Sequence, residues 1–162
     1  MRNQIPVAVH LFFLHNEQVL LLRRFNTGYE DGNYSVVAGH VDAGESVTQA
    51  AIREAREEVN VSLKPQDMAV VHVMHRKSDD ERIDFFLTVR GWVGEITNRE
   101  PHKCDDLSWY PLASLPNNII PYVKRGLENY QNGILYGEFG WRPYTIGVNT
   151  RELGAPMSDY IK

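Results

Sequence analysis

The sequence predicts an α/β protein in which a mixed β-sheet lies between helices. Most segments rich in β-branched and aromatic residues are short enough to be strands, one amphipathic helix is expected after the third of them, and a second near the end of the chain. This order favours a sheet covered on both faces. A chain of 162 residues can bury one core. We therefore expect one domain over residues 1–141, followed by a C-terminal arm or tail over residues 142–162 whose role the sequence does not assign.

The strands are predicted from β-branched and aromatic runs bounded by polar or turn-forming residues. A turn at His15, Asn16 and Glu17 would join the first two strands as a hairpin. The predicted strands cover residues 7–14, 18–23, 34–38, 68–75 and 83–93, with a short one at 107–110.

The first helix is predicted over residues 46–59. Ser46 is a suitable N-cap, and Gln49 three residues later would complete a capping box. Asn60 would end the helix in the left-handed conformation that asparagine tolerates. One face is apolar, as expected for a helix that packs closely on a sheet; its residues are Val47, Ala50, Ala51, Ala55 and Val59.

The second helix is predicted over residues 118–131. Asn117 or Asn118 would be its N-cap, and Asn132 with Gly133 would end it. Its apolar stripe would consist of Ile119, Val123, Leu127 and Tyr130.

The first helix carries three carboxylates on its other face. Glu54, Glu57 and Glu58 stand three and four residues apart, so they project from one side of the helix. Like charges at this spacing repel each other, and a hard divalent cation such as Mg²⁺ or Mn²⁺ would relieve the repulsion. The alternative is a solvated helix face with pairs such as Arg53 and Glu57. The glycine-flanked loop before the helix favours a metal, because its carbonyl oxygens can approach a cation.

The segment GHVDAGESVTQAAIREAREEVNV, residues 39–61, resembles the Nudix box. That pattern is matched at Gly39, Glu45, Arg53, Glu54, Glu57 and Glu58, with Ala55 and Val61 at its hydrophobic positions. Asn60 stands where the family usually has glycine. The resemblance implies a Nudix α/β/α sandwich. It also implies metal-dependent hydrolysis of a nucleoside diphosphate linked to another group, by attack of water on phosphorus.

The resemblance also implies roles for individual residues. Glu54, Glu57, Arg53 and Glu45 would be the catalytic residues, with Arg53 pairing to Glu45 or Glu57. The metal would be Mg²⁺, with Mn²⁺ as an alternative, and its ligands would be Glu54, Glu57, Glu58 and the backbone carbonyl of Ala38. A further carboxylate is expected from the loop before residue 107. We favour Asp105 or Asp106 there over Glu100.

Substrate contacts are harder to assign from the sequence. Arg23 or Arg24 at a strand end could reach a phosphate, His40 lies in the box loop, and Asn118 could read a base. Arg76 and Lys77 are weaker candidates, because Asp79 and Asp80 beside them indicate a polar hairpin tip. The aromatic residues that could stack on a base, but that could equally belong to the core, are Phe25, Tyr34, Trp92 and Trp109.

Composition narrows the class of partner. The net charge of −4 and the absence of a dense basic cluster make nucleic acid an unlikely partner, whereas a nucleotide needs only a few local cations. One cysteine, Cys104, excludes an intramolecular disulfide, and no apolar run is long enough to span a bilayer. We expect a cytoplasmic protein without membrane contact; a homodimer is left open.

The substrate is not fixed by the box. ADP-ribose and dinucleoside-polyphosphate members of the family usually carry a proline or a tyrosine beyond it, where this chain has Arg76, Lys77, Ser78 and Asp79. We therefore expect a nucleoside triphosphate or modified nucleotide. The alternatives are hydrolysis of ADP-ribose or nucleotide sugars, a nucleotide-binding sensor without turnover, and an interaction module.

Overall fold

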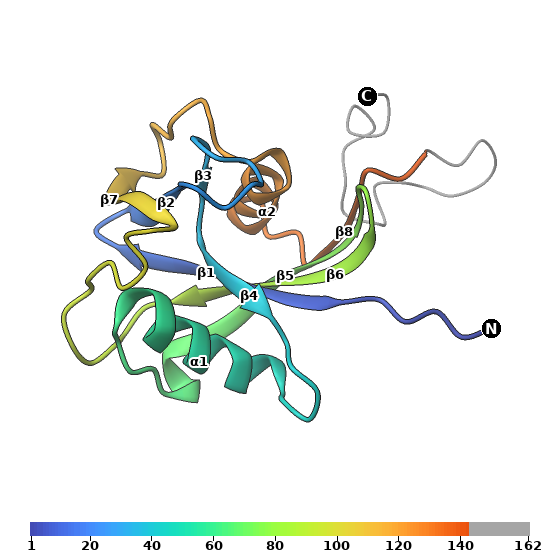
Figure 1. Ribbon diagram of the computed structural model, residues 1–162, viewed down its shortest axis with the longest axis horizontal. Helices are drawn as coiled ribbons and strands as arrows, with labels where there is room; N and C mark the ends of the chain where they lie inside the picture. Colours follow the sequence, from blue (N-terminus) through green and yellow to red (C-terminus); the bar gives the residue numbers. More distant parts are fainter. Residues whose placement is uncertain (143–162) are drawn as a thin grey trace.

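A computed structural model describes residues 1–142 of the chain. An eight-stranded mixed sheet lies between two α-helices, α1 and α2 (Figure 1). The elements in chain order are β1 (Val7–His15), β2 (Gln18–Arg24), β3 (Tyr34–Ser35), β4 (Val37–His40), α1 (Val47–Val59), a 3₁₀ turn (Pro65–Asp67), β5 (Met68–Lys77), β6 (Glu81–Val89), β7 (Cys104–Pro111), α2 (Pro121–Gln131) and β8 (Tyr136–Phe139).

The sheet contains both parallel and antiparallel pairs, so the prediction of a mixed sheet is confirmed. The strand order is β3-β2-β1-β6-β5-β8, with β4 pairing to β1 and β7 to β2. Strand β1 runs parallel to β6, β5 runs parallel to β8, and the remaining pairs are antiparallel. The predicted β1–β2 hairpin is present, and its turn residues Asn16 and Glu17 have φ values of 49° and 60°.

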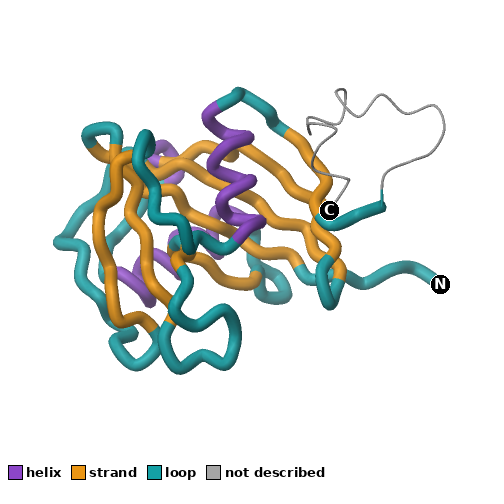
Figure 2. The backbone as a smooth tube through the Cα atoms, turned by 90° about the horizontal axis from the view of Figure 1, so that it is seen from above, coloured by secondary structure: helices purple, strands orange, loops and turns teal. Residues whose placement is uncertain are grey.

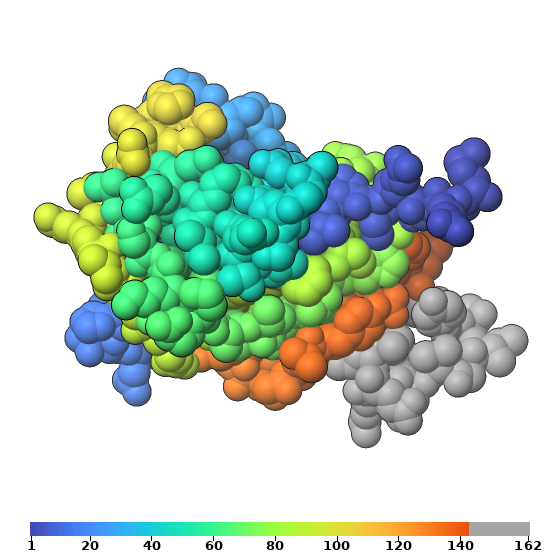
Figure 3. Space-filling model, turned by 90° about the horizontal axis from the view of Figure 1, so that it is seen from below, coloured from blue at the N-terminus to red at the C-terminus, as the bar shows by residue number. Residues whose placement is uncertain are grey.

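Two apolar layers hold the helices to opposite faces of the sheet (Figure 2). Side chains alternate along β1, so Leu11 and Phe13 pack in the layer under α1, whereas Phe12 and Leu14 pack in the layer under α2. Because β1 is buried on both faces, its sequence is an almost continuous apolar run. Figure 3 views the face on which α1 lies, beyond which the first residues of the chain project from the body.

Helix α1 forms as its sequence predicts. Ser46 is the N-cap and makes a reciprocal capping box with Gln49. The helix ends at Asn60, whose φ of 63° is left-handed. Ala50, Ala51, Ala55 and Val59 are buried against the sheet, and Glu54 and Glu58 on the neighbouring face adjoin strand β4.

Helix α2 differs from the prediction at its start. It begins at Pro121 with Ile120 as the N-cap, so the assignment of Asn117 or Asn118 to that position was wrong. Proline at the first helical position already fixes φ and has no N–H that needs a cap. The backbone carbonyl of Asn118 instead accepts a hydrogen bond from the Tyr34 amide.

Other differences lie at element ends. The predicted strand 34–38 is divided between β3, which pairs with β2, and β4, which pairs with β1. Strand β8 was not predicted, and the expected arm over residues 142–162 lies outside the described residues except at Arg142. No helix within residues 1–142 is long and apolar enough to cross a membrane.

Candidate active site

Arg53 connects helix α1 to the loop that precedes it. Its Nε and Nη2 donate to the two oxygens of Glu45 at 2.8 and 2.9 Å, and Nη2 also donates to the His40 carbonyl at 2.9 Å. Its Nη1 donates to Glu54 at 2.6 Å and to Glu57 at 3.3 Å. This fork, with a further hydrogen bond from the Asp42 amide, lowers the pKa of Glu45 to about 2.

Gly39 gives the carboxylate of Glu54 the room it needs. A Cβ built on Gly39 would lie 1.9 Å from Glu54 Oε1 and 2.1 Å from its Cδ. Any side chain there would therefore displace the carboxylate, which is only 8% exposed as a residue. The glycine of the sequence motif is thus required by the close approach of α1 to β4.

Glu58 contacts the same strand one residue earlier. Its Oε2 accepts a hydrogen bond from the Ala38 amide at 3.3 Å. In an antiparallel strand the N–H and C=O of one residue point to the same side. The Ala38 carbonyl therefore also points away from β1 and towards the side on which α1 presents Glu58.

The carboxylates of Glu54 and Glu58 are poorly solvated and repel each other. Burial raises the pKa of Glu54, with smaller contributions from Glu57 and Glu100, although Arg53 opposes the shift. Burial, followed by repulsion from Glu54 and Glu100, raises the pKa of Glu58 well above its usual value. A cation between these groups would reverse the effect.

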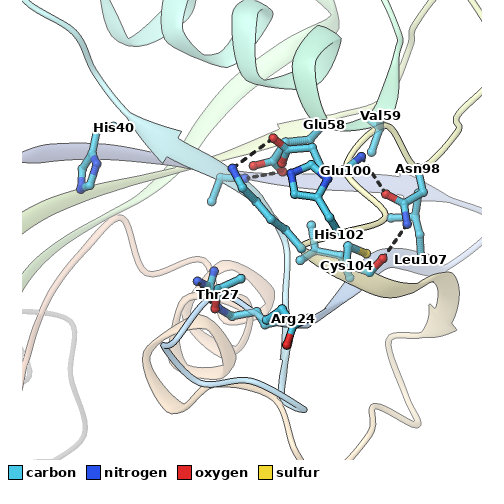
Figure 4. Close-up of a pocket in the computed structure, with 14 residues that line it drawn as sticks. Arg24, Thr27, His40, Glu58, Val59, Asn98, Glu100, His102, Cys104 and Leu107 are labelled. Atoms are coloured by element: carbon cyan, nitrogen blue, oxygen red, sulfur yellow. Dashed lines mark hydrogen bonds and ion pairs between the residues drawn. The ribbon is translucent and has the colours of Figure 1, made fainter.

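A pocket of about 570 Å³ opens beside Glu58 (Figure 4). Glu58 and Glu100 lie close together on one side of it, and Arg24 and Thr27 lie across from them. The lining also includes Ala38, His40, His102, Lys103, Cys104 and the apolar residues Leu22, Val59 and Leu107.

The structure places Glu100, rather than the favoured Asp105 or Asp106, at this pocket. Asp105 accepts two hydrogen bonds from Arg23, at 2.7 and 3.2 Å. Asp106 accepts hydrogen bonds from Tyr34, Ser108 and Tyr110. Arg23 and Tyr34, each more than seventy residues away in the chain, thus engage the two aspartates, and no local pattern reveals these contacts.

Of the two adjacent arginines, Arg24 faces the pocket and Arg23 does not. Arg24 donates to the Tyr29 carbonyl at 2.6 Å and to Thr27 Oγ1 at 3.0 Å, and neither partner carries a charge. Its positive charge reaches Glu58, whose pKa it lowers slightly against the larger effect of burial. Arg24 therefore retains a net charge with which to bind an anion.

The other predicted site residues are distributed unevenly. His40 lines the pocket and contacts Arg82 at 2.8 Å. Glu57 has a side chain that is 55% exposed, with Arg53 as its ion-pair partner. Asn118 donates to the Gly32 carbonyl at 2.8 Å. It lines neither this pocket nor a second pocket, described below, that adjoins it. The aromatic residues Phe25, Tyr34, Trp92 and Trp109 also lie outside both pockets.

A second pocket of about 510 Å³ adjoins the first and shares Arg24, Ala38 and His40 with it. It lies on the α2 side of β4, and its wall includes Arg76 and Tyr122. The sequence indicated a polar hairpin tip at Arg76, but the residue is only 4% exposed. The signal that was missed is Asp84, its buried partner across the β5–β6 hairpin.

The donor chemistry of the site suits a hard divalent cation. Glu54, Glu58, Glu100 and the Ala38 carbonyl offer only oxygen atoms, the set that Mg²⁺ and Mn²⁺ prefer. Over residues 1–142, no three carboxylate, imidazole or thiol groups are already gathered at ligand geometry. Arg53 occupies Glu54 and Glu57 in this conformation, so metal binding requires these carboxylates to exchange that partner.

Comparison with known proteins agrees with this geometry. The family model of the NUDIX domain matches residues 4–130. Phosphatase NudJ of Escherichia coli K12 is 29% identical over 121 residues, covering 68% of this chain and 77% of that protein. Among solved structures, the MutT NUDIX hydrolase from Burkholderia pseudomallei superposes with a TM-score of 0.71 at 23% identity, covering 78% of this chain and 98% of that one.

A further solved structure was determined with ligands. The bifunctional NMN adenylyltransferase/ADP ribose pyrophosphatase from Francisella tularensis, complexed with AMP and a manganese ion, has a TM-score of 0.61 at 18% identity, covering 81% of this chain and 42% of that one. Because the family model covers most of the chain and the box residues converge on one site, this protein belongs to the Nudix family and is a MutT-like pyrophosphohydrolase acting on nucleotide derivatives.

Proposed function

We propose that the protein hydrolyses the pyrophosphate bond of a nucleoside triphosphate or modified nucleotide in a Mg²⁺-dependent reaction, with Mn²⁺ as an alternative cation. One observation carries the proposal. The poorly solvated carboxylates of Glu54 and Glu58 adjoin the strand edge at Ala38, next to a pocket lined by Arg24, whose hydrogen-bond partners within residues 1–142 are uncharged.

Glu54, Glu58 and the Ala38 carbonyl would hold the cation, with Glu57 as a further ligand once it leaves Arg53. A bound divalent cation neutralises phosphate charge and makes water a better nucleophile. The raised pKa of both Glu54 and Glu58 supports this assignment, because ligands that repel each other without a cation gain most from binding one.

Phosphoryl transfer depends on positioning and charge neutralisation. Arg24 would bind a phosphate oxygen from the side opposite Glu58. A water oxygen would then form a bond to phosphorus while the bond between phosphorus and the bridging oxygen breaks, and the bridging oxygen leaves with the second phosphate. The water proton would pass to a carboxylate.

We assign the role of accepting that proton to Glu100, in place of Asp105 or Asp106, which the sequence favoured. Glu100 lies beside Glu58 at the pocket, and its carboxylate pairs with Lys103 at 3.4 Å. Arg53 and Glu45 act as positioning residues, because their paired fork fixes the loop and α1 relative to each other.

The test is a product-release assay with purified protein. The panel contains nucleoside triphosphates, nucleotide sugars, ADP-ribose and dinucleoside polyphosphates, each with Mg²⁺, with Mn²⁺ and with a chelator. We expect turnover of triphosphates that the chelator abolishes. Faster turnover of ADP-ribose or nucleotide sugars would replace the substrate class, and tight nucleotide binding without turnover would favour a sensor.

Variants separate the assigned roles. Glu58→Gln, Glu57→Gln and Glu100→Gln should each lower kcat by about two orders of magnitude or more, because several kcal/mol of charge stabilisation is lost. Glu128→Gln on α2, which lines neither pocket, is the matched control and should keep full activity. Asp105→Asn decides between the loop carboxylates: a loss as large as that of Glu100→Gln would return the role to Asp105.

A further inference from the structure

The second pocket has a wall built from buried charges. The Asp84 carboxylate is fully buried and accepts hydrogen bonds from Arg76 Nε at 2.6 Å, from Arg76 Nη2 at 3.3 Å and from His10 Nε2 at 3.0 Å. Burial opposes ionisation of Asp84, but the hydrogen bonds and charges of His10 and Arg76 outweigh the effect of burial and hold the pKa of Asp84 at about 2. The network crosses β1, β5 and β6, so it fixes Arg76 to the sheet.

Arg76 is also fixed from the side of α2. Its guanidinium lies over the ring of Tyr122, with Cζ 3.9 Å from the ring centre. A planar guanidinium held at one edge by a carboxylate and at one face by an aromatic ring has lost most of its rotational freedom. Its remaining donors are therefore preorganised.

Those donors can be counted. Nη1 and Nη2 each carry two hydrogens. Within the described residues Nη1 uses one for Ser78 Oγ at 3.3 Å, and Nη2 uses one for Asp84. One N–H remains on each nitrogen of a residue that lines the second pocket.

The charge balance indicates which acceptor these donors suit. Asp84 neutralises Arg76, and Asp80 pairs with Arg82 at 2.9 Å, so neither arginine offers an unbalanced charge to a phosphate. Arg24, at the junction of the pockets, does offer one. A neutralised, immobile guanidinium is better matched to a neutral carbonyl oxygen, as in its recognition of base edges.

Two further features of the wall suit a planar polar group. Tyr29 lines the pocket with a ring that is 47% exposed, and Arg24 Cζ lies 5.2 Å from the ring centre. His10, also in the wall, has a buried Nδ1 with no hydrogen-bond partner among the described residues. Asp84 engages Nε2 at 3.0 Å, so Nδ1 is the ring nitrogen that is left for a ligand.

We propose that the second pocket binds the base of the nucleotide and that Arg76 is a specificity-determining residue, which selects bases with a ring carbonyl and rejects adenine. This inference rests on the proposed function for the pyrophosphate site. Adenine presents an amino group where hypoxanthine and guanine present a carbonyl, so its N–H would face the N–H groups of Arg76. Asn118, which the sequence suggested for base reading, lies outside this pocket.

The closest comparison is between inosine and adenosine nucleotides, which differ at the purine 6-position. In the wild type, kcat/KM for ITP should exceed that for ATP by about tenfold or more, as expected for one well-formed arginine contact to a base edge. Arg76→Lys keeps a positive charge beside Asp84 but removes the fork. The variant should lower the ratio of kcat/KM for ITP to kcat/KM for ATP towards one, mainly by raising KM for ITP. Arg90→Lys, outside both pockets, is the matched control.

Binding provides a readout that does not depend on turnover. Calorimetric titration of the wild type with IMP and AMP should show the same preference, and Arg76→Lys should remove it. A ratio near one in the wild type, or an unchanged ratio in a folded Arg76→Lys protein, would overturn the inference. If nothing is hydrolysed but IMP still binds more tightly than AMP, the proposed reaction fails and the base preference stands.

Discussion

Replacing Glu58 by glutamine should raise the melting temperature of the protein when no divalent cation is present, although it removes activity. Glu58 stands four residues after Glu54, and Glu100 lies beside it on the same side of the pocket. Both repel its carboxylate, and burial adds to the penalty of ionisation. Glutamine has no charge but keeps an oxygen that can accept the Ala38 N–H.

The size of the effect follows from the helix spacing. Residues at i and i+4 lie about 6 Å apart. Two unit charges at that distance repel by roughly 3 kcal/mol at an effective dielectric constant of about 20, and by about 0.7 kcal/mol in bulk water. Because Glu58 is half-buried, we expect a gain of about 1–2 kcal/mol, or a rise in Tm of about 3–6 °C for a chain of this size.

The dependence on pH has a definite sign. The pKa of Glu58 is higher in the folded than in the unfolded state, so its ionisation destabilises the fold as pH rises from the unfolded value of 4.5 through the folded value. The gain from Glu58→Gln should therefore be larger at pH 8 than at pH 5.

Thermal unfolding followed by circular dichroism, in a chelator and then in excess Mg²⁺, measures the effect. Mg²⁺ should stabilise the wild type, by about 2.7 kcal/mol at one hundred times its Kd, and should stabilise the variant less. Glu57→Gln is the matched control, because Glu57 is exposed and pairs with Arg53. A lower Tm for Glu58→Gln than for wild type in chelator at pH 8 would refute the reasoning.

Three further substitutions test the residues that position the carboxylates of the site. Gly39→Ala should lower kcat by at least about tenfold and the free energy of unfolding by about 1–3 kcal/mol, because the new Cβ forces the Glu54 carboxylate aside. Steady-state kinetics measure the first effect and thermal unfolding the second. Arg53→Lys removes the fork to Glu45, so the pKa of Glu45 should rise from about 2. Its lowered value contributes stability above pH 4.5 that is lost as pH falls towards 2, so a flatter acid-unfolding curve is expected for this variant. Ser46→Ala should cost about 1 kcal/mol in urea unfolding through loss of the α1 cap while leaving kcat within about twofold, and a large fall in kcat would show that the cap also shapes the site.

Local patterns predicted the parts of the fold that local interactions determine. Helix α1 depends on a cap, an apolar stripe and a left-handed end, all within residues 46–60, and each is present. The convergence of Glu45, Arg53 and Glu54 could likewise be predicted, because the loop and helix are adjacent in the chain.

Sequence patterns failed where the partner is distant. Asp105 and Glu100 differ little in sequence context, and only the pairing of β2 with β7 places Asp105 beside Arg23. Arg76 has three acidic residues near it in sequence, yet its shortest hydrogen bond, at 2.6 Å, is to Asp84 on the neighbouring strand. Strand register therefore determines which of several chemically similar residues lies at the site, and strand register cannot be read from local sequence patterns.

Strand β4 gains a further property from the contacts that form the site. Within residues 1–142 its single strand partner is β1, and an unpaired strand edge is a template on which another chain can add and begin to aggregate. Here α1 covers that edge: Glu58 accepts the Ala38 N–H, and Arg53 donates to the His40 carbonyl. The side chains that converge at the candidate active site thus also satisfy backbone groups of this edge, so their removal would open it to pairing with another chain.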